Sequence, residues 1–395
     1  MGVYQKDANN DGKYTVGGDD KVYIYLTMRR GGRAIYALDV TDPGEPRFLW
    51  KIDNSSFPEL GQTWSHPKPA KIKANTNPVV IFGTGYDPNQ DNLTPPVADT
   101  MGRGIFVVDA FDGTLIWQAG PSPSGTPNTT VSDMLYSIPA DVTVINSDVD
   151  SYDDRMYVGD TGGNVWRVDI ADPDPANWAV NKLAALAAVG NTRKFLHAPD
   201  AVPGEDGSGT YDAVLIGSGD REHPFDTTVT NRFYMLKDRP IFEGATISES
   251  DLIDQTTSQN PVPVGKKGWF ITLGSGEKTV GGNAVTLAGT TFFVTNQPAP
   301  PAPGTCASNL GIARLYQVSY ENAAAVTDNV ADSNLTVEDR FETLPGGGFQ
   351  PPPTPVAVDI DGTIREGVVV GVHTEQVPSK TTGQRSRVFW YQEIE

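Results

Sequence analysis

The chain has 395 residues and carries 49 acidic against 30 basic side chains, a formal net charge of −19 at pH 7. A surface this negative repels a phosphate backbone, so nucleic acid is excluded as the expected partner. The 41 glycines and 31 prolines, with 38% hydrophobic residues, favour one large repetitive β domain over several compact α/β domains. No apolar run reaches the roughly 20 residues that span a bilayer, so no transmembrane segment is expected.

The N-terminus begins within what reads as a polar loop and lacks the basic and apolar regions of a signal peptide. We therefore expect residues 1–395 to form a single domain that is the C-terminal piece of a longer protein. The single cysteine, Cys306, cannot form an internal disulfide, so cysteine usage does not decide between an oxidising and a reducing compartment.

Six segments share one pattern: a small or arginine-flanked turn, an apolar strand with an aromatic residue near its centre, and a polar end. In chain order they are residues 32–40, 102–110, 163–170, 231–238, 312–320 and 386–394. Each follows another β-rich run, and these runs are residues 21–27, 78–85, 155–160, 213–220, 290–297 and 366–373. Two pairs continue into a third strand that contains tryptophan, and the second of these follows Asp112-Gly113, a dipeptide typical of hairpin turns.

Strand pairs that recur without an intervening helical pattern predict an all-β fold, a β-propeller whose blades are small antiparallel sheets. We expect a modified propeller of seven blades, six of them visible in the sequence and the seventh completed from N-terminal or unrecognised segments. The repeat spacing of about 60 to 80 residues exceeds the ~40 to 50 of compact propeller repeats, so the excess is expected in loops. Residues 176–190 have apolar spacing that fits one short helix ending at Gly190.

An acidic segment lies between the predicted strands 141–145 and 155–160. Oxygen-bearing residues occupy positions 1, 3, 5, 7 and 9 of this loop, namely Asn146, Asp148, Asp150, Tyr152 and Asp154. This register points alternate oxygens at one calcium ion, with position 7 contributing its backbone carbonyl. Position 12, a glutamate in an EF-hand, is Tyr157 here, so the pattern predicts an EF-hand-like Ca²⁺ loop within a β-hairpin. The alternative is a solvated acidic turn without a metal.

A weaker version of the pattern occurs near the N-terminus. Asp7, Asn9 and Asp11 stand at positions 1, 3 and 5, but position 9 is a threonine, a poorer ligand, so a second calcium site is left open there. The acids of residues 359–362 have no further acid in register, and a plain hairpin turn is expected.

Several linked motifs occur in order along the chain: GGRAIYALDVTDPGEPRFLW at 31–50, GDTGGNVWRVDI at 159–170, GSGDREHPF at 217–225, NRFYMLKD at 231–238, and KKGWFITL followed by GEK at 266–278. Together they resemble the C-terminal domain of the PilY/PilC family of type IV pilus-associated adhesins, which are pilus biogenesis factors. The resemblance runs over nearly the whole chain. It implies a modified β-propeller similar to those of quinoprotein dehydrogenases, with one calcium ion in the acidic hairpin. The first ligand is commonly Asp in the family and is Asn146 here, which removes one negative charge.

The resemblance also implies a function in pilus assembly, in the control of pilus extension against retraction, in twitching motility and in surface attachment. The implied partners are pilus proteins, such as minor pilins at the pilus tip, and host-surface ligands. The implied location is the bacterial cell surface, at the pilus tip or outer membrane, reached by export through the periplasm.

A quinone-dependent oxidoreductase is the first alternative, because quinoprotein enzymes share the propeller shape. The vicinal cysteine pair of some such enzymes is impossible with one cysteine, and the four histidines are scattered singly among loops, at positions 66, 197, 223 and 373. Asp220, Glu222 and His223 could form a small metal or acid/base site, or could simply cap neighbouring strands. No nucleophile motif, phosphate loop or zinc spacing appears, so we expect a protein that is not an enzyme. A ligand-binding propeller with no link to pili is the second alternative.

Overall fold

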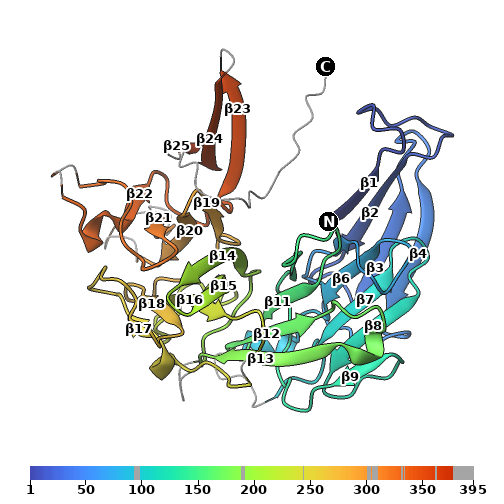
Figure 1. Ribbon diagram of the computed structural model, residues 1–395, viewed down its shortest axis with the longest axis horizontal. Coiled ribbons are helices and arrows are strands. Elements are labelled where there is room, and N and C mark those ends of the chain that lie inside the picture. Colours follow the sequence, from blue (N-terminus) through green and yellow to red (C-terminus); the bar gives the residue numbers. More distant parts are fainter. Residues whose placement is uncertain are drawn as a thin grey trace. The chain divides into compact units, whose positions relative to one another are not determined.

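The computed structural model of the protein describes residues 1–92, 98–187, 192–242, 244–299, 304, 310–330, 332, 334–360 and 363–376. Within these residues every regular element is a β-strand or a short 3-10 helix, and the strands form six small sheets (Figure 1). The chain divides into two compact units. The described residues of the first are Met1–Val158 and Arg167–Val180, and those of the second are Gly159–Trp166 and the residues from Asn181 onward.

The first unit begins with a sheet of four sequential antiparallel strands: β1 (Gly2–Lys6), β2 (Lys21–Thr27), β3 (Ala34–Asp39) and β4 (Arg47–Asp53). The next sheet contains β5 (Lys68–Ala70), β6 (Val79–Gly83), β7 (Ile105–Asp109), β8 (Leu115–Gly120) and β9 (Asn128–Thr130), the last parallel to β8. Tyr25 Oη and Trp50 Nε1 each donate a hydrogen bond of 3.1 Å to the carbonyl oxygen of Ala110. The tryptophan predicted on a third strand is therefore anchored in the core between these two sheets.

The acidic segment belongs to the third sheet, whose strands in order are β10 (Thr143–Ile145), β11 (Arg155–Gly159), β12 (Asn164–Asp169) and β13 (Ala179–Ala185). The short helix predicted over 176–190 is wrong, because most of the described part of that segment forms β13. The backbone of this strand also bonds to Ile247, whose N–H donates to Leu183 O at 2.8 Å and whose carbonyl accepts from Ala185 N at 2.9 Å. Such inter-segment bonds satisfy the backbone groups, and this pairing overrides a local preference for helix.

The second unit contains the remaining sheets. The fourth sheet has β14 (Asp200–Asp206), β15 (Gly209–Gly217), β16 (Arg232–Asp238), β18 (Gly268–Thr272) and β17 (Ile253–Asp254) in that order. The fifth has β19 (Val285–Leu287), β20 (Thr290–Gln297), β21 (Ile312–Ser319) and β22 (Phe341–Leu344), and the sixth has β23 (Thr354–Ile360), β24 (Thr363–Val370) and β25 (His373–Gln376). Phe293 packs face to face with Phe233 and Tyr316, at ring-centroid distances of 3.8 and 4.6 Å, so aromatic residues of consecutive sheets share one core.

Five of the six predicted strand pairs are adjacent strands within a sheet, namely β2–β3, β6–β7, β11–β12, β15–β16 and β20–β21. The sixth pair begins with β24, and its predicted second member, residues 386–394, lies outside the described residues. Strands β6 and β7 are buried along their whole length, as their uninterrupted runs of Val, Ile and Phe lead one to expect.

Candidate metal centre

The predicted calcium loop closes the β10–β11 hairpin of the first unit. Ile145 pairs with Arg155, so residues 146–154 form the connection between the two strands. Val149 and Ser151 have φ angles of 63° and 76°, in the left-handed region that non-glycine residues rarely adopt. Backbone strain of this kind tends to collect where a loop is shaped for a ligand.

The oxygen-bearing side chains of the loop accept hydrogen bonds from the loop's own backbone. Asn146 Oδ1 accepts from Val149 N at 2.6 Å, and Asp148 Oδ1 accepts from Asp150 N at 3.2 Å. Asp150 Oδ1 accepts from Tyr152 N at 3.0 Å. Residues 146–152, which hold the first four predicted ligands, are therefore ordered as a series of tight turns.

Asp154, the last predicted ligand, fixes the start of the loop. Its side chain is buried, and its carboxylate accepts from Ser147 N and Ser147 Oγ at 2.9 Å and from Asp148 N at 3.2 Å. Asp154 N in turn donates to Ile145 O at 2.9 Å. The Asp154 carboxylate therefore joins the two ends of the loop, in addition to its predicted role as a calcium ligand.

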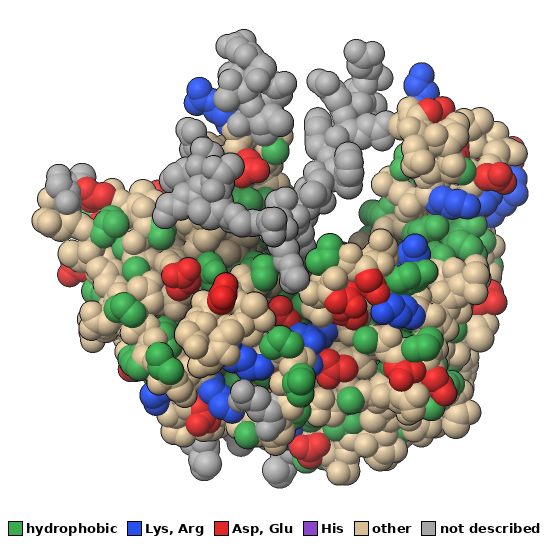
Figure 2. Space-filling view, viewed as in Figure 1, with side chains coloured by type: hydrophobic (Ala, Val, Ile, Leu, Met, Phe, Trp, Pro, Cys, Tyr) green, Lys and Arg blue, Asp and Glu red, His purple; other side chains and the backbone are tan. Residues whose placement is uncertain are grey.

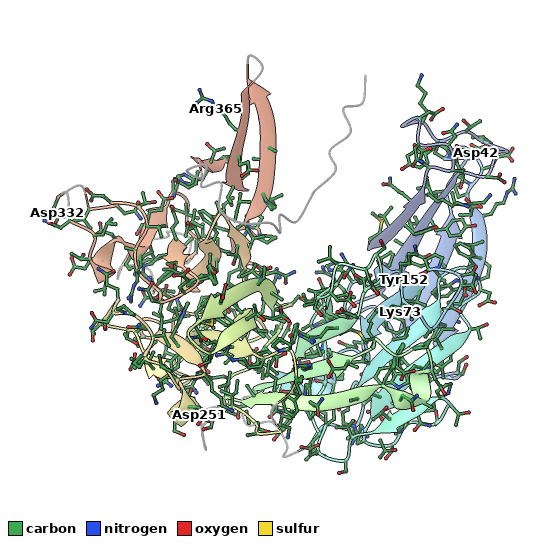
Figure 3. The ribbon with its side chains drawn as sticks, viewed as in Figure 1. Asp42, Lys73, Tyr152, Asp251, Asp332 and Arg365 are labelled. Atoms are coloured by element: carbon green, nitrogen blue, oxygen red, sulfur yellow. The ribbon has the colours of Figure 1, made fainter. Side chains whose placement is uncertain are left out.

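Two lysines that follow β5, Lys71 and Lys73, contact the loop; Figure 3 labels Lys73 and the loop residue Tyr152. Lys73 Nζ lies 2.6 Å from Asp150 Oδ2 and also interacts electrostatically with Asp148 and Asp154. Its hydrogen bond with Asp150 raises the pKa of Lys73, and the same bond, aided by Tyr152 N, lowers the pKa of Asp150. Lys71 places its ammonium 4.7 Å from the Tyr152 ring centroid. Sequence reasoning missed both lysines, because no local spacing connects them with a loop so much later in the chain.

The oxygen ligands of the loop are of the type that calcium prefers, but their atoms are not gathered around a single point. The loop offers an amide oxygen, three carboxylates and the Tyr152 carbonyl, hard oxygen ligands of the kind that Ca²⁺ takes. Among the described residues, however, the one group of three acid or histidine side chains whose ligand atoms all lie within 4.8 Å of one another is elsewhere, at Glu342, His373 and Glu375. The Lys73 ammonium supplies a positive charge beside Asp150. The residues therefore fit calcium in chemistry and charge, although one of the carboxylates is paired with Lys73.

The weaker N-terminal pattern lies in the connection between β1 and β2. Asp7 Oδ2 accepts from Gly12 N at 2.7 Å, and Asp7 Oδ1 is a buried atom with no hydrogen-bond partner among the described residues. The loop is closed by Asp20, which is buried and accepts from Ala8 N and Thr15 N at 2.8 Å each. The sequence pattern did not single out Asp20, and a second calcium site here stays a prediction.

The acids of residues 359–362 belong to the β23–β24 hairpin, in which Ile360 pairs with Thr363. Asp361 and Gly362, the expected turn, lie outside the described residues.

The Asp220-to-His223 segment is held by lysines of the second unit. Asp220 Oδ2 lies 2.7 Å from Lys194 Nζ and 2.8 Å from His223 Nδ1. Burial alone would raise the pKa of Asp220, but Lys194 and His223 outweigh it and hold that pKa below its usual range. Lys278 Nζ donates to the carbonyl oxygens of residues 223, 224 and 226. These contacts favour the interpretation of the segment as a rigid loop over that of an acid/base site.

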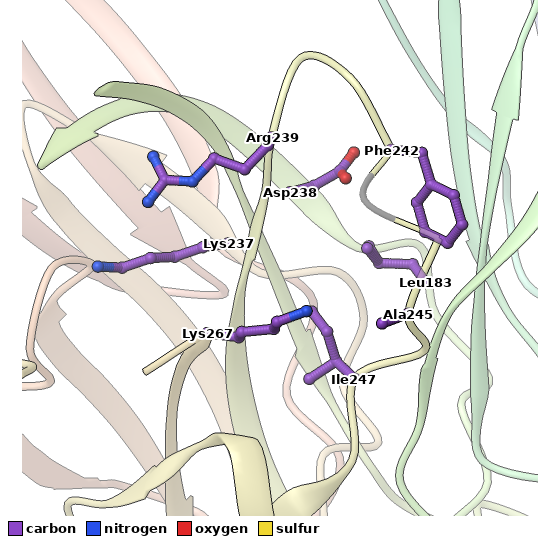
Figure 4. Close-up of a pocket in the computed structure, with 8 residues that line it drawn as sticks. All are labelled: Leu183, Lys237, Asp238, Arg239, Phe242, Ala245, Ile247 and Lys267. Atoms are coloured by element: carbon purple, nitrogen blue, oxygen red, sulfur yellow. The ribbon is translucent and has the colours of Figure 1, made fainter. Parts of the chain in front are cut away.

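Two cavities lie in the described part of the protein. One, of about 310 Å³, opens beside the acidic loop and is lined by Lys71, Lys73, Ala74, Asn75, Thr76 and Tyr152. The other, shown in Figure 4, is bordered by Leu183, Phe242 and Lys267 but has a volume of about 10 Å³, room for about one water molecule. The visible surface carries acidic and basic side chains interspersed (Figure 2). Of these two cavities, the one beside the acidic loop is the larger.

The small, largely antiparallel sheets that follow one another along the chain define the class: an all-β propeller, with an acidic loop in one of its hairpins. Residues 8–195 match the family described as the PilY1 beta-propeller domain. The chain is also similar to a crystal structure of the Pseudomonas aeruginosa PilY1 C-terminal domain, with 18% identity and a TM-score of 0.70 over 95% of this chain and 83% of that one. The predicted fold class, a modified β-propeller, is confirmed.

Curated relatives point the same way. The type IV pilus biogenesis factor PilY1 of Pseudomonas aeruginosa strain UCBPP-PA14 is 27% identical over 258 residues, which cover 58% of this chain and 20% of the relative. A PilY1 homolog from Xylella fastidiosa is 29% identical over 190 residues, covering 45% of this chain and 12% of that protein. The chain thus spans about a fifth or less of the length of these relatives. The predicted resemblance to the C-terminal domain of the PilY/PilC family is confirmed.

Proposed function

We propose that the chain is the calcium-responsive propeller of a type IV pilus biogenesis factor, and that it sets the balance between pilus extension and retraction. Through that balance it would govern twitching motility and surface attachment. Relatives named as type IV pilus biogenesis factors support the link to pili. The link to calcium is supported by the acidic loop 146–154.

The observation that carries the proposal is the ion pair between Lys73 and Asp150. The loop gathers three carboxylates whose mutual repulsion favours a bound cation. Lys73 provides a weak, tethered cation, whereas Ca²⁺ would provide two charges and bind several oxygens together. The loop thus has two alternative partners for one carboxylate, which makes it a two-state element that a ligand can bias.

The proposed partners are pilus proteins, minor pilins or other components of the pilus tip, together with host-surface ligands. The proposed location is the bacterial cell surface, at the pilus or outer membrane, after export through the periplasm. In the described part of the chain, no helix is both long enough and apolar enough to cross a membrane.

We also propose that the protein is not an enzyme. The relatives are named for pilus biogenesis rather than for a reaction. A quinone-dependent oxidoreductase remains the enzymatic alternative, and it predicts a cofactor absorbance band in the purified protein. A pilus-independent binding propeller predicts normal piliation in every loop variant.

Piliation of a strain that carries Asp150→Ala tests the proposal. We expect the protein to accumulate normally while the number of surface pili and the twitching zone change, because the loop can no longer hold calcium. Asp42→Ala is the matched control, since Asp42 also caps an exposed turn, by accepting from Gly44 N at 2.9 Å, but lies outside the loop. Pilus counts and twitching equal to wild type in Asp150→Ala, with calcium binding lost in vitro, would contradict a regulatory role.

A further inference from the structure

A second cluster of metal-ligand side chains lies in the second unit, away from the acidic loop in sequence. His373 and Glu375 belong to β25, which follows β24 after a tight turn at Gly371, whose φ is 61°. Successive side chains of a strand point to opposite faces, so these two residues stand on the same face of β25. Glu342 comes from β22 of another sheet, where it pairs with Leu315 of β21.

The three side chains converge on one ring nitrogen. His373 Nε2 lies 2.6 Å from Glu342 Oε1 and 2.8 Å from Glu375 Oε1. A ring nitrogen carries at most one proton, so it can donate a well-directed hydrogen bond to only one of the two carboxylates. Glu342 Oε1 is accordingly a buried atom that accepts no hydrogen bond of good geometry from the described part of the chain. About three quarters of each side chain is buried, with exposed fractions of 24 to 27%.

An arrangement of this kind is costly without a cation. A buried oxygen that lacks a hydrogen bond loses its hydration without compensation, and two neighbouring carboxylates repel each other. A divalent cation at this position would contact all three ligand atoms and neutralise both carboxylates.

We propose that Glu342, His373 and Glu375 form a binding site for a divalent transition-metal ion, of which Zn²⁺ is the best suited. Zinc accepts imidazole nitrogen together with carboxylate oxygen, and three protein ligands leave a fourth position for water. Calcium prefers six to eight oxygens and is not expected here. Because the ligands come from β22 and β25, the ion would join the β24–β25 hairpin to a second sheet. The site does not depend on the calcium proposal.

Calorimetric titration of the metal-free chain with ZnCl₂ tests the site. We expect one Zn²⁺ ion to bind at the cluster, with an affinity that falls at least about tenfold in Glu342→Gln and in His373→Ala. Glu342→Gln preserves the size of the side chain, so its loss of binding cannot come from a cavity. His66→Ala is the matched control, because His66 Nδ1 lies 2.8 Å from a single carboxylate, that of Asp141. An unchanged titration in both cluster variants overturns the site, and so does an equal loss in His66→Ala.

Amide hydrogen exchange gives a second readout that does not depend on affinity. Zinc should slow exchange in β25 of the wild-type chain and should have no such effect in His373→Ala. Calcium at the same concentration should leave β25 unchanged. Zinc binding without added protection of β25, or equal protection in the His373→Ala chain, would contradict a site that joins β22 to β25.

Discussion

Lys73 Nζ lies 2.6 Å from Asp150 Oδ2, so a lysine that follows β5 of one sheet pairs with the loop that closes a hairpin of the next sheet. The pair places a tethered cation at the oxygen cluster where we propose that calcium binds. One carboxylate cannot bind both partners fully, so we expect the lysine and the ion to compete.

Replacing this lysine should strengthen calcium binding. Lys73→Met removes the competing charge and retains most of the aliphatic side chain, and we expect the calcium dissociation constant to fall about two- to fivefold, in keeping with a partly exposed ion pair. Calorimetric titration with CaCl₂ measures the change.

Lys51→Met is the control for this variant. Lys51 Nζ lies 2.6 Å from Asp53 Oδ2, so it forms a comparable ion pair that is not part of the loop. Its loss should leave the calcium affinity unchanged. Weaker calcium binding in Lys73→Met would show that the lysine helps to form the site rather than competing for it.

Asp154 should matter for stability even without calcium. In Asp154→Asn one carboxylate oxygen becomes an amide N–H₂ group that faces the donors Ser147 N and Asp148 N. We expect a loss of about 1–3 kcal/mol in the free energy of unfolding, measured by urea denaturation in the presence of a chelator. Asp148→Asn, whose Oδ1 accepts one bond of 3.2 Å in an exposed turn, should change it by less than about 0.5 kcal/mol. Equal losses in the two variants would contradict the special role of Asp154.

Removal of calcium should loosen the hairpin 142–160 and leave the rest of the propeller folded. Stability in a repeat architecture is distributed over many neighbour contacts, and the aromatic core formed by Phe233, Phe293 and Tyr316 lies far from the loop in sequence. Hydrogen exchange with and without a chelator is the measurement. Loss of protection throughout the chain would mean that the metal holds the whole domain together.

Acid should destabilise the fold partly through Asp206. Burial would raise the pKa of Asp206, but Lys237 and Arg239, whose nitrogens lie 2.7 and 2.9 Å away, hold that pKa well below its usual range. A carboxyl with a depressed folded pKa stabilises the fold above its unfolded pKa of about 3.9, and this contribution disappears as the pH falls through the folded value. Wild type should therefore lose stability below about pH 4.

The Asp206→Asn variant isolates that contribution. Its urea midpoint should be lower than that of wild type at pH 7, and it should fall less between pH 5 and pH 3. Asp42→Asn, at an exposed turn, serves as the control and should follow the wild-type curve. Identical acid dependence in wild type and Asp206→Asn would show that the ion pairs do not contribute.

Local patterns in the sequence were sufficient for the strand pairs and for the acidic hairpin. The apolar runs with a central aromatic residue predicted adjacent strands such as β2–β3 and β20–β21, because those strands bury one or both faces. The same local reasoning failed at 176–190. There the backbone pairs with β12 and with Ile247, and the alanine and leucine spacing carries no information about those partners.

In the candidate sites, too, local sequence patterns predicted some residues and missed others. The register of Asn146 to Asp154 is visible in one short segment, and the structure places all of it in one hairpin loop. Lys73 and Glu342 were not visible, because each reaches its partner through packing that joins distant segments. Asp20 was missed although its partners Ala8 and Thr15 are near in sequence, because it stands outside the 1-3-5 register of that loop. His373 was noticed only as a lone histidine, because the predicted β-rich run 366–373 ends there; β25 continues to Gln376, and the His-x-Glu spacing puts both side chains on one face of that strand.

The central claim is that the loop 146–154 binds calcium, and titration calorimetry of the wild-type chain against Asp150→Ala tests it most directly. We predict about one tightly bound Ca²⁺ per wild-type chain and an affinity at least about tenfold weaker in Asp150→Ala. Tyr152→Phe should bind as wild type does, because only the backbone carbonyl of that residue is proposed to coordinate. Calcium binding of full strength in Asp150→Ala would contradict the claim.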